Sequence, residues 1–107
     1  KEIISVFEPH RYSRVLSLKK EFAKSFLNSN YVLLCPIYAA GERPKLKYNN
    51  FEFAKLIAKL SKTQVIIIQN YSDIQKYLKK NLTNNKIIIG MGAGLISKYM
   101  RELKTFI

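Results

Sequence analysis

Short apolar runs recur along the chain and alternate with stretches whose apolar residues keep helical spacing. The apolar runs cover residues 3–7, 31–35, 65–68 and 87–89, and each predicts a strand. They are apolar throughout and do not alternate with polar residues. This indicates strands that are buried on both faces, and therefore a parallel sheet.

The helical stretches lie between and after these strands. Apolar residues three and four positions apart predict helices over residues 15–27, 53–60, 72–78 and 96–103. Residues 37–50 contain Gly41, Pro44 and paired asparagines, so this segment is predicted to be a long loop. Four strands alternating with four helices predict one α/β domain over residues 1–107. We expect a Rossmann-like, open and mainly parallel sheet of about four strands with helices on both faces.

The composition adds a strong positive charge, formally +12 at pH 7, which is also typical of nucleic-acid-binding domains. The spacing of the lysines argues against that function, because many of them fall on the outer faces of predicted helices. They are Lys55, Lys59 and Lys62 on one helix and Lys76, Lys79 and Lys80 on another. We therefore expect no nucleic-acid partner, although the charge suits an anionic ligand. No apolar run approaches the roughly 20 residues that cross a bilayer, so no membrane partner is expected either.

Cys35 is the only cysteine, which excludes an internal disulfide and favours a reducing compartment, the cytoplasm. It lies in the apolar run 31–35, where a buried and inert thiol is expected. The chain begins on Lys1, almost directly in a predicted strand and without a signal-peptide pattern. A chain that opens in this way is expected to be a fragment of a larger protein.

Residues that suit an anion follow the first predicted strand. His10, Arg11 and Arg14 come where this strand ends, and ligands of open α/β sheets gather at the carboxyl ends of strands. If a helical turn begins here, the two arginines are three residues apart and share a face. Guanidinium groups bind carboxylate or phosphate with paired hydrogen bonds, and an imidazole can orient a ligand or carry a proton. The alternative is that both arginines form surface salt bridges and that His10 is an ordinary loop residue.

Glycines gather after the fourth predicted strand, at Gly90, Gly92 and Gly94. Such a turn can bring the backbone close to a phosphate, but the dinucleotide fingerprint is imperfect because Ser97 takes its third glycine place. Tight packing of strand against helix is the expected role, and a free-standing nucleotide-binding module is the alternative. Glu42, in the long loop, could meet a cation or an amine, but an exposed loop acid is the default expectation. No spacing of His, Cys, Asp and Glu predicts a metal site, and no phosphate loop occurs.

Three segments, in this order, resemble the C-terminal domain of the Mur ligases, and most closely that of the members that add L-alanine. Residues 7–14, Phe-Glu-Pro-His-Arg-Tyr-Ser-Arg, are similar to their characteristic stretch, residues 37–42 to the loop that follows, and residues 92–94 to the last strand-to-helix turn. The likeness runs along nearly the whole chain. Glu8 departs from it, since the family usually has Gln there. A related murein peptide ligase has Glu at this place but lacks His-Arg-Tyr-Ser-Arg, and it stays an alternative.

The resemblance implies an enzyme that joins L-alanine to UDP-N-acetylmuramate in peptidoglycan synthesis, using ATP and Mg²⁺. In this family the alanine amine attacks an acyl phosphate formed on the muramoyl carboxylate. His10, Arg11 and Arg14 would lie near the incoming alanine and the reacting phosphate. The UDP-sugar domain, the central ATPase domain and the first strand–helix unit of this domain are missing, and the two domains are the expected partners of the chain. The chain alone is expected to be inactive and to bind no cofactor.

Overall fold

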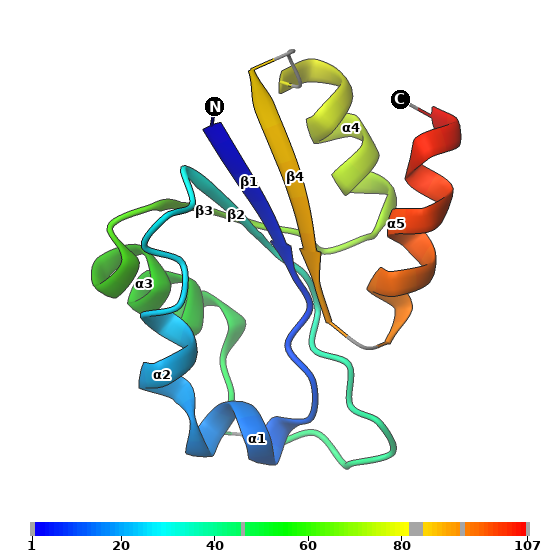
Figure 1. The fold of residues 1–107 in the computed structure, drawn as a ribbon. Helices are drawn as coiled ribbons and strands as arrows, with labels where there is room; N and C mark the ends of the chain where they lie inside the picture. Colours follow the sequence, from blue (N-terminus) through cyan, green and yellow to red (C-terminus); the bar gives the residue numbers. More distant parts are fainter. Residues whose placement is uncertain (1, 46, 82–84, 93, 107) are drawn as a thin grey trace.

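The computed structural model describes residues 2–45, 47–81, 85–92 and 94–106, with side chains up to residue 101. Four strands form one sheet (Figure 1): β1 Glu2–Phe7, β2 Tyr31–Leu34, β3 Gln64–Ile67 and β4 Lys86–Met91. All neighbouring pairs are parallel, and the order across the sheet is β3-β2-β1-β4. The predicted α/β class and the parallel sheet of four strands are confirmed.

Helices cover both faces of the sheet. They are α1 Tyr12–Ser17, α2 Lys19–Ala23, α3 Asn50–Ser61, α4 Ser72–Asn81 and α5 Leu95–Phe106. Figure 1 shows α1, α2 and α3 on one side of the sheet and α4 and α5 on the other. Each step from one strand to the next passes through a helical crossover, because parallel neighbours cannot be joined by a tight hairpin.

Two hydrophobic cores, one on each face, explain why the strands are apolar throughout. Successive residues of a strand point to opposite faces. Ile4 and Val6 of β1 therefore pack with Leu78 beneath α4 and α5. Phe7, the next residue, packs with Phe53 on the side of α1, α2 and α3. A strand that serves both cores has no polar face, which is the pattern seen in the sequence.

The predicted helix over residues 15–27 is wrong in its bounds. The observed helical segment begins earlier, with α1 at Tyr12, and ends earlier, with α2 at Ala23. It is interrupted at Leu18, whose φ of −114° lies outside the helical range. Beyond that point the Ser61 hydroxyl of α3 donates to the Ala23 carbonyl (2.5 Å) and accepts from the N–H of Phe26 (3.0 Å). A side chain distant in sequence thus replaces the helical hydrogen bonds. The apolar spacing did not mark a continuous helix: it includes the buried Val15 and Phe26, but Leu18 is 41% exposed.

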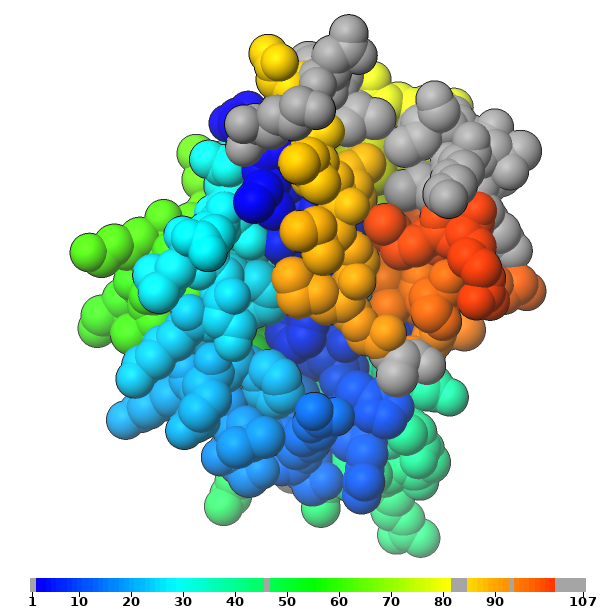
Figure 2. Space-filling model, in the orientation of Figure 1, coloured from blue at the N-terminus to red at the C-terminus, as the bar shows by residue number. Residues whose placement is uncertain are grey.

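One face of β4 is not covered by a helix. Ile87 and Ile89 are 44% and 41% exposed, and in the register of the sheet they lie beside Ile3 and Ser5 of β1. In the part of the chain that the structure describes, β4 is also an edge strand, paired with β1 alone. Figure 2 shows β4, gold to orange, as an open strip at the surface. Contiguous apolar surface at a sheet edge is characteristic of a face that contacts another element.

Candidate functional site

The segments that follow β1, β2 and β4 meet at the carboxyl end of the sheet. After β1 and β2 the chain runs side by side, because the N–H of Tyr38 donates to the Pro9 carbonyl (2.8 Å) and the N–H of Arg11 donates to the Tyr38 carbonyl (2.7 Å). The rings of Tyr38 and His10 lie 5.3 Å apart, centroid to centroid. The turn after β4 reaches the same tyrosine, since a Cβ on Gly94 would lie 2.4 Å from its ring. The three segments singled out in the sequence therefore meet in one place, which is the candidate site.

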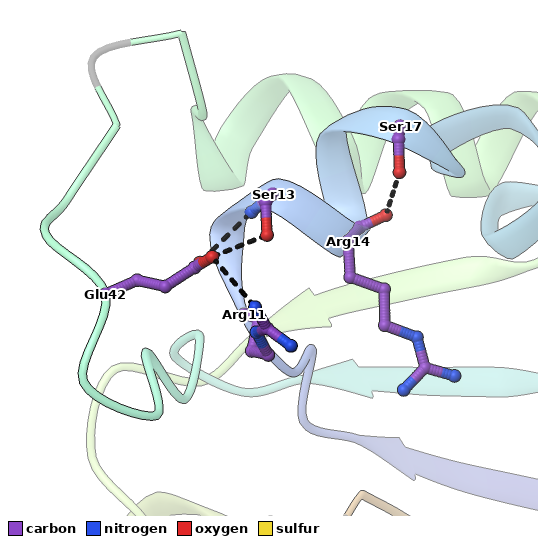
Figure 3. Close-up of polar contacts among 5 residues, drawn as sticks. All are labelled: Arg11, Ser13, Arg14, Ser17 and Glu42. Atoms are coloured by element: carbon purple, nitrogen blue, oxygen red, sulfur yellow. Dashed lines mark hydrogen bonds and ion pairs between the residues drawn. The ribbon is translucent and has the colours of Figure 1, made fainter.

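Arg11 is turned towards Glu42 (Figure 3). Its φ of 68° places its backbone outside α1, and its guanidinium lies 3.6 Å from the Glu42 carboxylate. The same carboxylate accepts hydrogen bonds from the N–H of Ser13 (3.1 Å) and from the Ser13 hydroxyl (2.5 Å). The bonds from Ser13, and after them the charge of Arg11, lower the pKa of Glu42 from its usual value. Glu42 therefore satisfies the first turn of α1, where backbone N–H groups lack helical partners.

A pocket of about 320 Å³ opens beside His10 and Arg14. Its other lining residues are Phe7, Glu8, Phe22, Ser25, Phe26, Met91 and Gly92. The Arg14 guanidinium lies over the Phe22 ring, 5.7 Å from its centroid. Among the described residues no acidic side chain pairs with Arg14. The structure thus separates the two arginines that a helical turn would bring to one face: Arg11 is paired with an acid, and Arg14 is available to an anion.

Close packing accounts for the glycines at the end of β4 and in the turn that follows it. A Cβ on Gly92 would lie 2.5 Å from Ile96 and 2.9 Å from the Cβ of Glu8. The φ of Gly92, 149°, is also one that other residues rarely adopt. A Cβ on Gly90 would lie 2.6 Å from Met100. Packing is a sufficient reason for this turn, so the glycines need no bound phosphate to account for them.

Glu8 was not among the predicted site residues, yet it lies at the centre of the site. It follows β1 directly, is 1% exposed, and its Oε1 accepts a hydrogen bond from the N–H of Gly94 (2.9 Å). Its Oε2 accepts a hydrogen bond from the Tyr71 hydroxyl. Burial, and after it the Glu8 carboxylate, raises the pKa of Tyr71. The signal that could have found Glu8 is an acid directly after a buried strand, at the sheet edge where ligands gather.

Cys35 and the lysines of the helix faces lie outside this candidate site. Cys35 is fully buried, as predicted, and burial raises the pKa of its thiol to about 12, with a smaller contribution from the Glu8 charge. The lysines predicted on helix faces are exposed, although Lys62 lies just beyond the end of α3, where its φ of 50° is left-handed. Within the described ranges no three His, Cys, Asp or Glu side chains gather to hold a metal ion. None of the helices described there is long and apolar enough to cross a membrane.

Comparison with known proteins gives relatives that match almost the whole chain, although no protein-family model matches it. The chain is 48% identical to the UDP-N-acetylmuramate–L-alanine ligase of Pelagibacter ubique, over 99% of its residues. It is 41% identical to that of Lachnospira eligens over 92% of its residues, and 36% identical to that of Fusobacterium nucleatum over 94%. The chain spans only 21% to 23% of the length of these relatives. Identity at this level along nearly every residue shows that this stretch of sequence is homologous to the C-terminal part of UDP-N-acetylmuramate–L-alanine ligases.

Proposed function

We propose that the chain is the amino-acid-binding part of an ATP-dependent ligase that adds L-alanine to UDP-N-acetylmuramate in peptidoglycan synthesis. Identity of 48% along 99% of the chain to a ligase of that name supports the reaction. The murein peptide ligase alternative has no such support among the relatives compared above. Because the chain spans about a fifth of those relatives, the activity would belong to a longer polypeptide in the cytoplasm, and the chain alone would be inactive.

The position of Arg14 carries the assignment of the amino-acid side. Its guanidinium lies at the pocket, over the Phe22 ring, and no acidic side chain among the described residues forms an ion pair with it. An arginine in this state binds a carboxylate with two parallel hydrogen bonds. The carboxylate of L-alanine would be held in this way, while its amine stays free to attack the activated muramoyl carboxyl group. Fixing the nucleophile in this geometry lowers the entropic part of the barrier.

The apolar wall of the pocket suits the same ligand. Phe7, Phe26 and Met91 line it together with the polar groups. They offer a surface for the alanine methyl group and exclude water, which strengthens the ion pair at Arg14. His10 lines the same pocket and would orient the amine or the reacting phosphate by a hydrogen bond.

Arg11 would act after a rearrangement. It is 53% exposed and paired with Glu42 at 3.6 Å, so it can turn to a new anion without leaving a buried position. Exposed ion pairs of this kind stabilise a protein by about 0–1 kcal/mol, a small amount for a phosphate to overcome. The proposal therefore places Arg14 on the alanine carboxylate and Arg11 nearer the reacting phosphate.

ATP and Mg²⁺ would be held mainly by other parts of the polypeptide. The sequence has no phosphate loop, and the described side chains include no acidic cluster that fits a metal ion. The ATPase domain and the UDP-sugar domain are therefore the proposed partners of this chain. The exposed apolar face of β4 at Ile87 and Ile89 supports contact with further parts of the same polypeptide.

The test is alanine addition by the longer polypeptide that contains these residues. Arg14→Ala should raise the KM for L-alanine by roughly tenfold to a hundredfold, as expected when hydrogen bonds to a charged group are lost. Arg11→Ala should act more on kcat. Arg43→Ala, an exposed arginine in the loop after β2, is the matched control and should leave both constants unchanged.

Other outcomes would decide against the proposal. Full activity of Arg14→Ala would remove its assigned role. Use of a murein peptide in place of L-alanine would favour the related peptide ligase. Micromolar binding of ATP, NAD or a UDP-sugar to the 107-residue chain alone, measured by calorimetry, would favour a free-standing nucleotide-binding module.

A further inference from the structure

We propose that Glu8 is a positioning residue for the alanine side of the site: it fixes the turn after β4 and the Tyr71 ring, and so holds one wall of the pocket that faces His10 and Arg14. This inference rests on the proposed function above. Neither the family resemblance nor the relatives compared above assigns a role to this residue. The argument depends on the burial of Glu8, its hydrogen bonds and its neighbours.

The carboxylate of Glu8 is a costly group to bury. It is 1% exposed, and no lysine, arginine or histidine among the described residues forms an ion pair with it. A buried carboxylate without a cation must be stabilised by hydrogen-bond donors. Gly94 and Tyr71 supply them, one to each oxygen. The hydrogen bonds therefore explain why this side chain can lie where it does.

These bonds tie together three elements that are distant in the sequence. Glu8 directly follows β1, Tyr71 directly precedes α4, and Gly94 directly precedes α5. The backbone N–H of Glu8 also donates to the carbonyl of Met91, the last residue of β4 (2.9 Å). One side chain thus sets the relative positions of both helix starts on the α4 and α5 face of the sheet.

The same side chain borders the proposed alanine pocket. Glu8, Met91 and Gly92 are adjacent lining residues, and His10 follows Glu8 by two positions. A Cβ on Gly92 would lie 2.9 Å from the Cβ of Glu8, so the turn and the carboxylate are already in close contact. Loss of the carboxylate would free the turn to move, and the pocket wall would move with it.

Glutamine can reproduce this arrangement, and alanine cannot. The Gln amide oxygen can accept from the N–H of Gly94, and its NH₂ group can donate to the Tyr71 hydroxyl oxygen. The geometry stays the same while the direction of one hydrogen bond is reversed. Alanine removes both acceptors and leaves a small cavity. Rescue by glutamine therefore separates positioning by hydrogen bonds from any need for the charge.

The experiment uses the longer polypeptide and compares Glu8→Gln, Glu8→Ala and Tyr71→Phe, with Glu21→Ala on the exposed side of α2 as control. Glu8→Ala should raise the KM for L-alanine about tenfold while the KM for ATP changes less than about twofold. Glu8→Gln should stay within about threefold of the parent, and Tyr71→Phe should fall between them. Hydrogen exchange of the segment 94–97, measured by mass spectrometry, should speed up in Glu8→Ala and not in Glu8→Gln.

Several results would overturn the inference. One is an unchanged KM for L-alanine in Glu8→Ala; another is a Gln variant as impaired as the Ala variant. If Glu8→Ala does not fold, Tyr71→Phe and Glu8→Gln still test the inference. The hydrogen-bond model predicts a larger loss of alanine binding in Tyr71→Phe than in Glu8→Gln, so an equal loss in both variants excludes it. If the parent polypeptide does not add alanine, the proposed function fails. The exchange measurement then still tests Glu8, and unchanged exchange in Glu8→Ala refutes its hold on the turn.

Discussion

Gly94 lies against the face of the Tyr38 ring, so closely that a Cβ on the glycine would come within 2.4 Å of a ring carbon. The same ring lies 5.3 Å from that of His10. Tyr38 thus joins the loop after β2 to the segment after β1 and to the turn after β4. The site depends on this contact between Tyr38 and Gly94, which are 56 positions apart in the sequence.

Gly94→Ala should destabilise the fold by about 1–3 kcal/mol, because the new methyl group must displace a half-buried aromatic ring. Gly90→Ala is the matched comparison. Its Cβ would lie 2.6 Å from the Cγ of Met100, a flexible side chain that must change rotamer to make room, so its cost should be smaller than that of displacing the Tyr38 ring. Urea denaturation of both variants checks the order. Equal losses would contradict the tight contact at Tyr38.

Ser61→Ala should lower the free energy of unfolding by about 2 kcal/mol or more. The hydroxyl bonds two backbone groups in a buried region, the Ala23 carbonyl and the Phe26 N–H. Removing the partner of a buried polar group costs about 1–3 kcal/mol for each group. Ser25→Ala is the control, since its hydroxyl donates to the Glu21 carbonyl at an exposed position. A comparable loss in both variants would argue against the role of Ser61 in ending α2.

Cys35 should be almost unreactive in the folded protein. Burial raises the pKa of its thiol to about 12, so at pH 8 only about one molecule in ten thousand carries the reactive thiolate. Modification by a disulfide reagent should be slow in buffer and fast in concentrated urea, where the side chain is exposed. Rapid modification of the folded chain, with its circular dichroism unchanged, would show that the thiol is accessible.

The convergence of the three segments could be predicted from the sequence because it follows from strand direction. Runs such as 3–7 and 87–89 are apolar at every position, which indicates a parallel sheet, and the carboxyl ends of parallel strands share one edge. Any polar segment that follows such a strand arrives at that edge. The arrangement of the elements therefore needed no knowledge of individual side-chain contacts.

The details that could not be predicted depend on contacts between distant residues. The end of α2 at Ala23 depends on Ser61, which lies 38 positions further along the chain. The separation of Arg11 from Arg14 arises because Glu42, from another loop, captures Arg11 and the first turn of α1. Spacing along a helix carries no information about a partner supplied by a different segment.

Glu42→Gln should destabilise the fold in a pH-dependent way. The pKa of Glu42 is lowered in the folded state, chiefly by the hydrogen bonds from Ser13, relative to the ordinary value of 4.5. A group with a depressed folded pKa stabilises the fold above its unfolded pKa, and this contribution is lost as the pH falls through the folded pKa. The parent should therefore be more stable than the variant near neutral pH. The difference should shrink as the pH falls below 4.5.

Denaturation curves at several pH values check this, and Glu52→Gln, which removes an exposed acid from the first turn of α3, serves as the control. A difference between parent and Glu42→Gln that stays constant down to acidic pH would contradict the prediction. In that case the hydrogen bonds to Ser13 would not depend on the charge of the carboxylate.

The exposed face of β4 gives a prediction that tests whether further domains of the longer polypeptide cover this face. In the 107-residue chain Ile89 is 41% exposed, so Ile89→Lys should cost less than about 1 kcal/mol. If the longer polypeptide covers this face, the same substitution buries an unpaired charge there and should cost about 2 kcal/mol or more. Phe51→Lys, at a 62% exposed position on α3, should cost the same in both settings. Thermal or urea denaturation of both substitutions, each in the 107-residue chain and in the longer polypeptide, checks the comparison. A cost for Ile89→Lys that is equally small in the longer polypeptide would mean that the face of β4 stays open to solvent there too. The proposed contact with further domains would then have to lie on another surface.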